Sequence, residues 1–265
     1  MNRTKIPYCD YTWNPVTGCT MGCKYCYARR MTERNLWGYD FTPRFHPERL
    51  SEPLKVKKHS TIFVCDMGDL FDKQAIVGWV FDVVETIKEC PQHTFLFLTK
   101  RVKNMVSSAW ALEFGNGSLP QNIIWGVTCT TQADADKRIP ELLKILGKRW
   151  VSLEPLIEPI DLSEYLFHET GTLAFSDEEI NSAVYRHEKT PRLKNNNPII
   201  GNQLDWVVIG GMSGPKAPDT NIKAVESLVT QCDAASVPVF VKQVTVGGKV
   251  IHMPEILGKV WRQKP

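Results

Sequence analysis

The sequence predicts an α/β protein in which short strands alternate with helices around a mostly parallel sheet. Continuous apolar runs recur along the chain, and such runs are typical of strands buried on both faces. The clear ones are 61–65, 94–99, 122–128, 149–153, 205–209 and 237–241. Helical stretches between them favour repeated right-handed β-α units. With one weaker strand near the N-terminus, these six to seven strands fit an open or partial (β/α) barrel better than a closed barrel of eight.

The N-terminal part carries the weaker strand and one helix. Residues 5–13 are predicted to form the first strand, with Pro7 at its start. A turn at 14–18 leads into a cysteine-rich loop, and residues 27–36 are predicted to be helical. Residues 37–60 are rich in Pro, Arg, Lys and His, so they are expected to form an exposed excursion.

Helices are expected after each of the middle strands. Residues 73–89 carry apolar side chains at helical spacing, and Asp72 precedes them as a good N-cap. Another helix is expected near 101–113. A third should begin after Thr131, and it must accommodate Pro140.

The C-terminal part interrupts this alternation once. Residues 159–203 are polar and are predicted to form an insertion before the sixth strand. A helix over 220–236 and the last strand follow. Gly247 and Gly248 are expected to turn the chain into an irregular tail, about 244–265. The whole chain, 1–265, is expected to form a single domain.

Composition excludes few classes of protein. The 265 residues are 43% hydrophobic, which is enough for a substantial core. Lys and Arg total 32 against 29 Asp and Glu, and a net charge of +3 is too mild to indicate nucleic-acid binding by itself. The N-terminus lacks the apolar stretch of a secretory signal, and no apolar run is long enough to span a membrane. We therefore expect a cytoplasmic protein whose eight cysteines are free thiols.

A cysteine-rich loop is the most specific chemical feature. Cys19, Cys23 and Cys26 follow the pattern C-x3-C-x2-C, and Gly18 and Gly22 let the backbone fold closely around a bulky centre. Thiolates are soft ligands that select zinc, copper(I) or iron–sulfur clusters. Because no fourth ligand follows nearby, one metal position would stay open for chemistry.

This spacing resembles the signature of the radical S-adenosylmethionine (SAM) superfamily, including an aromatic residue, Tyr25, before the third cysteine. The resemblance implies a partial (β/α) barrel and a [4Fe–4S] cluster on Cys19, Cys23 and Cys26. One iron would chelate SAM, and reduction would cleave SAM to methionine and a 5′-deoxyadenosyl radical, with Tyr25 near the adenine. A donor such as flavodoxin or ferredoxin would supply the electron.

Charged residues and glycines gather where the predicted strands end. In β/α barrels, functional groups lie at the C-terminal ends of the strands. These ends supply Asp66, Gly68, Asp69, Lys100, Arg101, Thr128, Cys129, Glu154, Gly210, Gly211 and Lys242. Each alone fits an ordinary loop residue, whereas several at consecutive strand ends favour a site.

The resemblance implies roles for several of these residues. The segment Asp66–Asp69 stands where radical SAM enzymes often carry a Gly-Gly-Glu motif that binds the SAM amino group. Lys100 is the candidate partner of the SAM carboxylate. The ribose hydroxyls are assigned to Thr128, Ser152 and Glu154, and the approach of adenine to Gly210 and Gly211. The alternatives are a solvated lysine, ordinary ion pairs and a simple turn.

Cys129 carries a separate hypothesis. It follows Thr128 at the end of the fourth predicted strand, and some radical SAM enzymes use a cysteine to return a hydrogen atom to the product radical, so Cys129 is a candidate catalytic residue. The favoured alternative is that Cys129 packs as a small apolar residue, because free cysteines are often buried.

A longer pattern resembles an uncharacterised radical-SAM-like family that is common in bacteriophages and prophages. It consists of Trp13–Cys19, Asp69–Phe71, Leu98–Arg101 and Glu154–Leu156. A phage setting suggests a nucleic acid or nucleotide as substrate, by analogy. Basic and aromatic residues that could face such a substrate are Arg29, Arg30, Arg34, Arg44, Arg49, Trp37, Tyr39 and Phe45. An ordinary solvated helix face is the alternative.

Two rival functions stay open. One is a SAM-independent barrel enzyme that uses Asp66, Asp69 and Glu154 as acid–base groups or metal ligands. The other is a non-catalytic binding protein stabilised by zinc or an inert cluster, with Cys9 as the fourth ligand.

Overall fold

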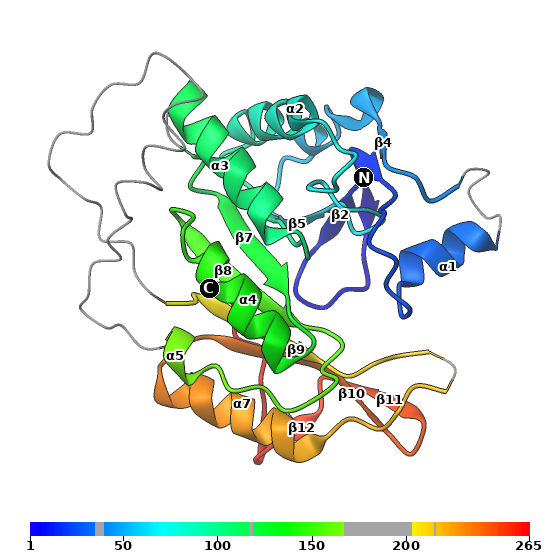
Figure 1. The fold of residues 1–265 in the computed structure, drawn as a ribbon, viewed down its shortest axis with the longest axis vertical. Coiled ribbons are helices and arrows are strands. Elements are labelled where there is room, and N and C mark those ends of the chain that lie inside the picture. Colours follow the sequence, from blue (N-terminus) through cyan, green and yellow to red (C-terminus); the bar gives the residue numbers. More distant parts are fainter. Residues whose placement is uncertain (35–39, 117–118, 167–202, 215) are drawn as a thin grey trace, which may run out of the picture.

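The protein is described by a computed structural model that covers residues 1–34, 40–116, 119–166, 203–214 and 216–265 (Figure 1). It confirms a mixed α/β fold with a mostly parallel central sheet. In these residues the main sheet has nine strands, in the order β1-β2-β5-β6-β7-β8-β9-β10-β11. Their bounds are Asn2–Arg3, Tyr11–Trp13, Thr61–Val64, Thr94–Leu96, Ile123–Thr128, Lys148–Leu153, Trp206–Gly210, Val239–Val246 and Lys249–His252.

Within the main sheet, the seven strands from β2 to β10 are all parallel, and their order in the sheet follows their order in the chain. Antiparallel strands β1 and β11 flank them at the two edges. Every parallel strand therefore ends at the same edge of the sheet, which brings the loops that follow β2, β5, β6, β7, β8, β9 and β10 together.

The two faces of the sheet are packed differently. Helices α2 (Val77–Lys88), α3 (Val102–Asn116), α4 (Gln132–Leu142) and α7 (Ile222–Ala234) lie along one face (Figure 1). Alternate strand residues pack with α2, α3, α4 and α7 in the main core, among them Trp13, Phe95, Trp125 and Val207. The opposite face holds a second cluster, in which Tyr8 packs on Trp150, Trp206 and Phe240.

Smaller elements complete the chain. Helix α1 (Tyr27–Glu33) follows the cysteine loop, and α5 (Ser163–Leu166) is a single turn. Two short 3-10 turns, Pro47–Arg49 and Pro53–Lys55, lie in the excursion before β5. Two small hairpins pair β3 (Val16–Thr17) with β4 (Arg44–Phe45), and β12 (Glu255–Ile256) with β13 (Lys259–Val260).

The prediction that Asp72 caps a helix was wrong. Helix α2 begins at Val77, with Ile76 at the N-cap position and no side-chain cap. Residues 73–76 stay outside the helix, because the Asp72 carboxylate binds other parts of the chain, described below. The predicted apolar face is otherwise found, since Val80, Val83, Val84 and Ile87 are buried.

Both chain ends also differ from the prediction. The first parallel strand is only Tyr11–Trp13, because residues 5–10 turn inward and place Tyr8 in the second cluster. The C-terminal tail is not irregular. Gly247 and Gly248 join β10 to β11, and the following hairpin buries Ile256 and Trp261.

Most of the predicted insertion, 167–202, lies outside the described residues, as do residues 35 and 36 of the first predicted helix. Along the part of the chain that the structure describes, no helix combines the length and apolar character needed to cross a bilayer.

Candidate functional site

The three cysteines of the loop differ from the other five. Cys19, Cys23 and Cys26 are partly exposed. The remaining cysteines are all buried, namely Cys9, Cys65, Cys90, Cys129 and Cys232. All eight are free and lie within the described residues. The scattered cysteines thus pack as core residues, and the thiols available to a metal are those of the predicted motif.

Two glycines fasten the start of the cysteine loop to the loop after β5. Gly18 and Gly68 form a parallel bridge, in which Gly18 N–H donates to Met67 O at 2.9 Å and Asp69 N–H donates to Gly18 O at 3.2 Å. A Cβ on Gly68 would lie 2.9 Å from the Gly18 backbone. Gly68 is therefore needed for this close approach, whatever it contributes to SAM binding.

Asp72 and Arg101 hold the middle of the loop. The Asp72 carboxylate accepts from Thr20 N–H at 2.8 Å and from the Thr20 hydroxyl, and it pairs with Arg101 at 3.1 Å. Arg101 also donates to Thr20 Oγ1 at 2.8 Å. Burial alone would raise the pKa of Asp72, but hydrogen bonds from Gln74 and Thr20, with the charge of Arg101, lower it below its usual range.

Backbone amides point at two of the thiols. Cys26 is the N-cap of α1, and its Sγ accepts from Arg29 N–H at 3.4 Å. Cys19 Sγ accepts from Met21 N–H at 3.3 Å. Burial, followed by the charge of Asp69, raises the pKa of the Cys19 thiol to about 12. A metal would have to displace that proton, so metal uptake should release it.

The residues around the loop fit an iron–sulfur cluster. Among the described side chains, no three His, Cys, Asp or Glu groups lie close enough to hold a single ion. A [4Fe–4S] cluster would be held by one thiolate on each of three irons. Arg29 donates to Cys19 O at 3.1 Å, and the Nε atoms of Arg29 and Arg101 are buried without a hydrogen-bond partner in the described structure. Two guanidinium groups with spare donors beside Cys19 suit an anionic centre.

The two carboxylates of the predicted SAM segment have different surroundings. Asp66 is partly buried, accepts from Asn14 Nδ2 at 2.7 Å, and faces the Tyr27 hydroxyl, which donates to its backbone carbonyl at 2.6 Å. Asp69 is buried, and both of its oxygens accept from Thr99 Oγ1. Burial raises the pKa of Asp69 to about 6. Asp66 is thus the less buried of the two carboxylates, and Asp69 ties two strand ends together.

Lys100 and Tyr25 lie together although the chain separates them widely. Lys100 Nζ sits 5.5 Å from the centre of the Tyr25 ring. Burial raises the pKa of Tyr25, and a hydrogen bond with Thr130, just beyond β7, opposes that shift. Thr128 is buried two residues earlier, and its N–H donates to Thr99 O at 3.0 Å.

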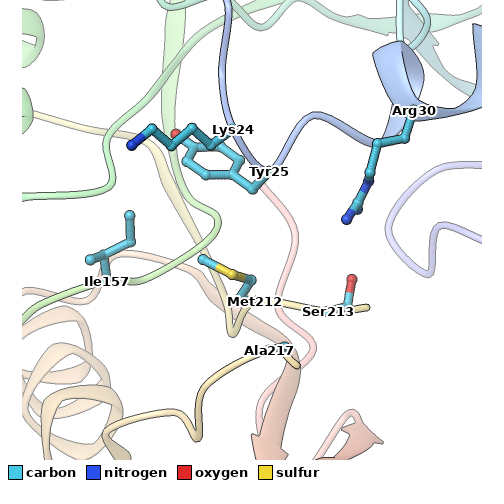
Figure 2. A pocket seen from close by; sticks show the side chains of 7 residues that line it. All are labelled: Lys24, Tyr25, Arg30, Ile157, Met212, Ser213 and Ala217. Atoms are coloured by element: carbon cyan, nitrogen blue, oxygen red, sulfur yellow. The ribbon is translucent and has the colours of Figure 1, made fainter. Parts of the chain in front are cut away.

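A cavity of about 450 Å³ adjoins Tyr25. Figure 2 shows Tyr25 and Arg30, from the cysteine loop and α1, facing Met212 and Ser213, from the loop after β9. Lys24, Ile157 and Ala217 complete the lining. The cavity therefore lies between the cysteine loop and the loops that follow β8 and β9.

Glu154 is the centre of a polar group at the ends of β8, β9 and β10. Its carboxylate pairs with Lys242 Nζ at 2.9 Å and accepts from Tyr8 and Ser152 hydroxyls at 3.3 Å each. A Cβ on Gly210 would clash with this carboxylate.

Gly211 and Cys129 are both surrounded by other residues of the protein. A Cβ on Gly211 would clash with the Thr220 hydroxyl, so the close approach predicted there is made by a side chain of the protein itself. Cys129 is fully buried in the main core, the packing position that the favoured alternative expects, and burial raises its pKa to about 12. Cys9 packs in the second cluster and would have to leave it to become a fourth metal ligand.

Several members of the predicted basic and aromatic surface have partners inside the protein. Arg29 lies 5.2 Å from the Phe41 ring centre, Arg49 donates to Asn14 O, and Phe45 stacks on Trp79. Arg30 lines the cavity. Trp37 and Tyr39 lie outside the described residues.

Asp72 is a functional candidate that the sequence analysis missed, whereas Arg101 and Lys242 were placed at strand ends without a role. Asp72 and Arg101 hold the cysteine loop, and Lys242 pairs with Glu154. Arg101 ends the pattern Leu98–Arg101 and Lys242 follows the apolar run of the last strand, so a signal existed for both. Asp72 carried only the misleading signal of a helix cap.

A family profile described as "Protein of unknown function (DUF5131)" matches residues 3–259. No curated protein matches the sequence. Three solved mutants of spore photoproduct lyase are similar in structure. A cysteine-to-serine mutant has a TM-score of 0.42 at 11% identity, over 79% of this chain and 57% of that one. A tyrosine-to-phenylalanine mutant has 0.43 at 11%, over 81% and 60%.

The third is a double mutant with bound AdoMet and dinucleoside spore photoproduct. Its TM-score is 0.40 at 13% identity, over 74% of this chain and 65% of that one. This chain thus spans less than two thirds of the length of each of the three lyase chains.

Proposed function

Since the chain belongs to the family described as a protein of unknown function, DUF5131, which names no reaction, we propose from the site itself that it is a radical SAM enzyme. One observation carries the proposal. The three cysteines of a C-x3-C-x2-C motif are partly exposed while the other five are buried, and they lie on a loop fastened at the C-terminal edge of a sequential parallel sheet. On this proposal the sheet is the partial (β/α) barrel of that superfamily.

Cys19, Cys23 and Cys26 would hold a [4Fe–4S] cluster, with the amides of Met21 and Arg29 donating to two of the sulfurs. A cluster bound there would supply one electron, received from a flavodoxin or ferredoxin, for the reductive cleavage of SAM to methionine and a 5′-deoxyadenosyl group that could abstract hydrogen. The protein contributes the cradle, the charge around it and the walls of the SAM site.

The cavity beside Tyr25 is the proposed adenine site. The apolar side chains of Ile157 and Met212 and the Tyr25 ring form walls that suit a flat heterocycle. Lys100, next to Tyr25, would pair with the SAM carboxylate, and Asp66, near the same loop, with its ammonium group.

Glu154 is the proposed ribose partner. Its carboxylate already accepts from hydroxyl groups of Tyr8 and Ser152, and a ribose diol offers the same kind of donor. The Thr128 N–H and the space beside Gly211 are taken up by contacts with other residues of the protein. On this proposal Thr128 and Gly211 therefore support the site without binding the ribose themselves.

The substrate class that we propose is a nucleic acid or nucleotide. Lys24 and Arg30 are exposed cations on the lining of the cavity, and two cations suit an anionic substrate. The analogy with a phage setting points to the same class.

Anaerobic reconstitution tests the proposal. The protein should take up about four irons and four sulfides per chain and, with dithionite, convert SAM to 5′-deoxyadenosine. Zinc in the protein purified in air, without cluster uptake or SAM cleavage, would favour the non-catalytic binding protein. Metal-dependent chemistry without SAM would favour the acid–base enzyme.

A further inference from the structure

The ion pair between Asp72 and Arg101 is buried, and it belongs to no helix or strand. The Asp72 side chain is fully inaccessible, and that of Arg101 is 17% exposed. Burying two charges costs several kcal/mol per ion before their attraction is counted, and apolar residues often replace such pairs without loss of stability. Stability alone is thus a weak reason for this pair.

What distinguishes the pair is its position. Asp72 lies in the loop after β5, Arg101 in the loop after β6, and both bind Thr20 between the first and second motif cysteines. The two residues therefore connect two strand ends to the cysteine loop. Groups of this kind, which do not touch a metal but orient its ligands, change metal affinity by about 10–100-fold when they are removed.

The pair also places two opposite charges beside the first motif cysteine. Both residues bind Thr20, which directly follows Cys19, so Arg101 favours negative charge there and Asp72 opposes it. Reduction of a cluster adds one negative charge, so the two residues should move its reduction potential in opposite directions.

We propose that Asp72 and Arg101 are positioning residues, which latch the cysteine loop to the strand ends and set the charge balance at Cys19. This inference rests on the proposed function for the identity of the centre. Its test needs neither a substrate nor SAM turnover, because cluster retention and reduction potential are measured on the loaded protein directly.

Three variants separate the attachment of the cysteine loop from the effect of charge. Arg101→Met removes both the hydrogen bond to the loop and the positive charge, so it should lower the reduction potential of the cluster. Asp72→Asn removes the negative charge and should raise that potential. Arg101→Lys keeps the charge but loses the forked guanidinium, so its potential should stay near that of the wild type. All three should lose iron to a chelator on the order of 10-fold faster than the wild type.

Arg149→Met is the matched control. Arg149 is a buried arginine paired with Asp205 at 3.6 Å, and it lies at the start of β8, at the edge of the sheet opposite to the strand ends. This variant should lose stability without any change in cluster potential or in iron release under native conditions. Potential shifts of the same sign in Arg101→Met and Asp72→Asn, or equally fast iron release from Arg149→Met, would overturn the inference.

The wild type separates the two proposals. A wild-type protein that holds its cluster but never cleaves SAM would defeat the proposed function alone, since the latch variants can still be compared. A wild-type protein that assembles no iron–sulfur cluster would defeat both.

Discussion

The carboxylate of Glu154 occupies the space that a side chain at residue 210 would need, so Gly210 and Glu154 fit only as a pair. Gly210→Ala should push Glu154 away from Lys242 and destabilise the protein by about 1–3 kcal/mol, as overpacking commonly does. Urea denaturation would measure this loss. Gly78→Ala is the control, because a Cβ there meets nothing within 4 Å and alanine favours a helix.

The same substitution should weaken SAM binding if Glu154 contacts the ribose. Gly210→Ala with wild-type stability would mean that the loop after β9 moves aside easily, and the proposed contact would then lose its structural support.

Each of the three loop cysteines should be needed for the centre. Cys19→Ala, Cys23→Ala and Cys26→Ala should each abolish iron uptake and SAM cleavage, because two thiolates hold a cluster poorly. Iron and sulfide analysis after anaerobic reconstitution measures the first effect. Cys9→Ala is the control and should keep its metal, since Cys9 packs among aromatic side chains. Loss of the metal in Cys9→Ala, with SAM cleavage never seen, would support the four-thiolate alternative.

Asp66 and Lys100 should fix SAM and leave the cluster unchanged. Asp66→Asn and Lys100→Met each remove one charge that complements the zwitterionic end of SAM, so both should weaken SAM binding in equilibrium dialysis. Iron content should stay at the wild-type value in both. Unchanged SAM affinity in the two variants would return these residues to ordinary structural roles.

Asp69 should make stability depend on pH in the chelator-treated protein. Burial raises its pKa from 3.8 to about 6, so the folded state binds this proton more tightly than the unfolded state. The stabilising contribution is complete below about pH 3.8 and is lost as the pH rises through about 6.

Relative to Asp69→Asn, the wild type should therefore lose about 2–3 kcal/mol of unfolding free energy between about pH 4 and about pH 7. Denaturant unfolding at several pH values measures the difference. If the unfolding free energies of the two proteins change with pH in the same way, then Asp69 titrates normally.

Cys129 should behave as a packing residue. It is fully buried in the main core, so Cys129→Ala should cost about 1 kcal/mol of stability and leave SAM cleavage intact. Thermal unfolding and 5′-deoxyadenosine formation check both. A variant of normal stability that releases altered or solvent-quenched product would restore the hypothesis that Cys129 donates hydrogen.

The central fold could be predicted because its strands are continuous apolar runs. Such runs suit a strand buried on both faces, and the runs 61–65, 122–128 and 149–153 each became a parallel strand. The rule that functional groups lie at strand ends also placed Lys100 and Tyr25 in one region, and Lys100 Nζ lies 5.5 Å from the centre of the Tyr25 ring.

The rest could not be predicted, because it depends on contacts between distant parts of the chain. Asp72 has the local chemistry of a helix cap, but its partner Thr20 lies 52 residues earlier and binds it instead. Tyr8 lies outside the strands, and it turns inward because it packs against three aromatic rings from β8, β9 and β10. Neither contact leaves a mark in local periodicity.

The sequential strand order has a consequence for biosynthesis. Gly68, Asp72 and Arg101, which fasten the cysteine loop, all precede helix α3, whereas Ile157, Met212 and Ser213 supply the opposite wall of the cavity. Because synthesis runs from the N-terminus, the nascent chain contains these three anchoring residues before the residues of the opposite wall have been translated.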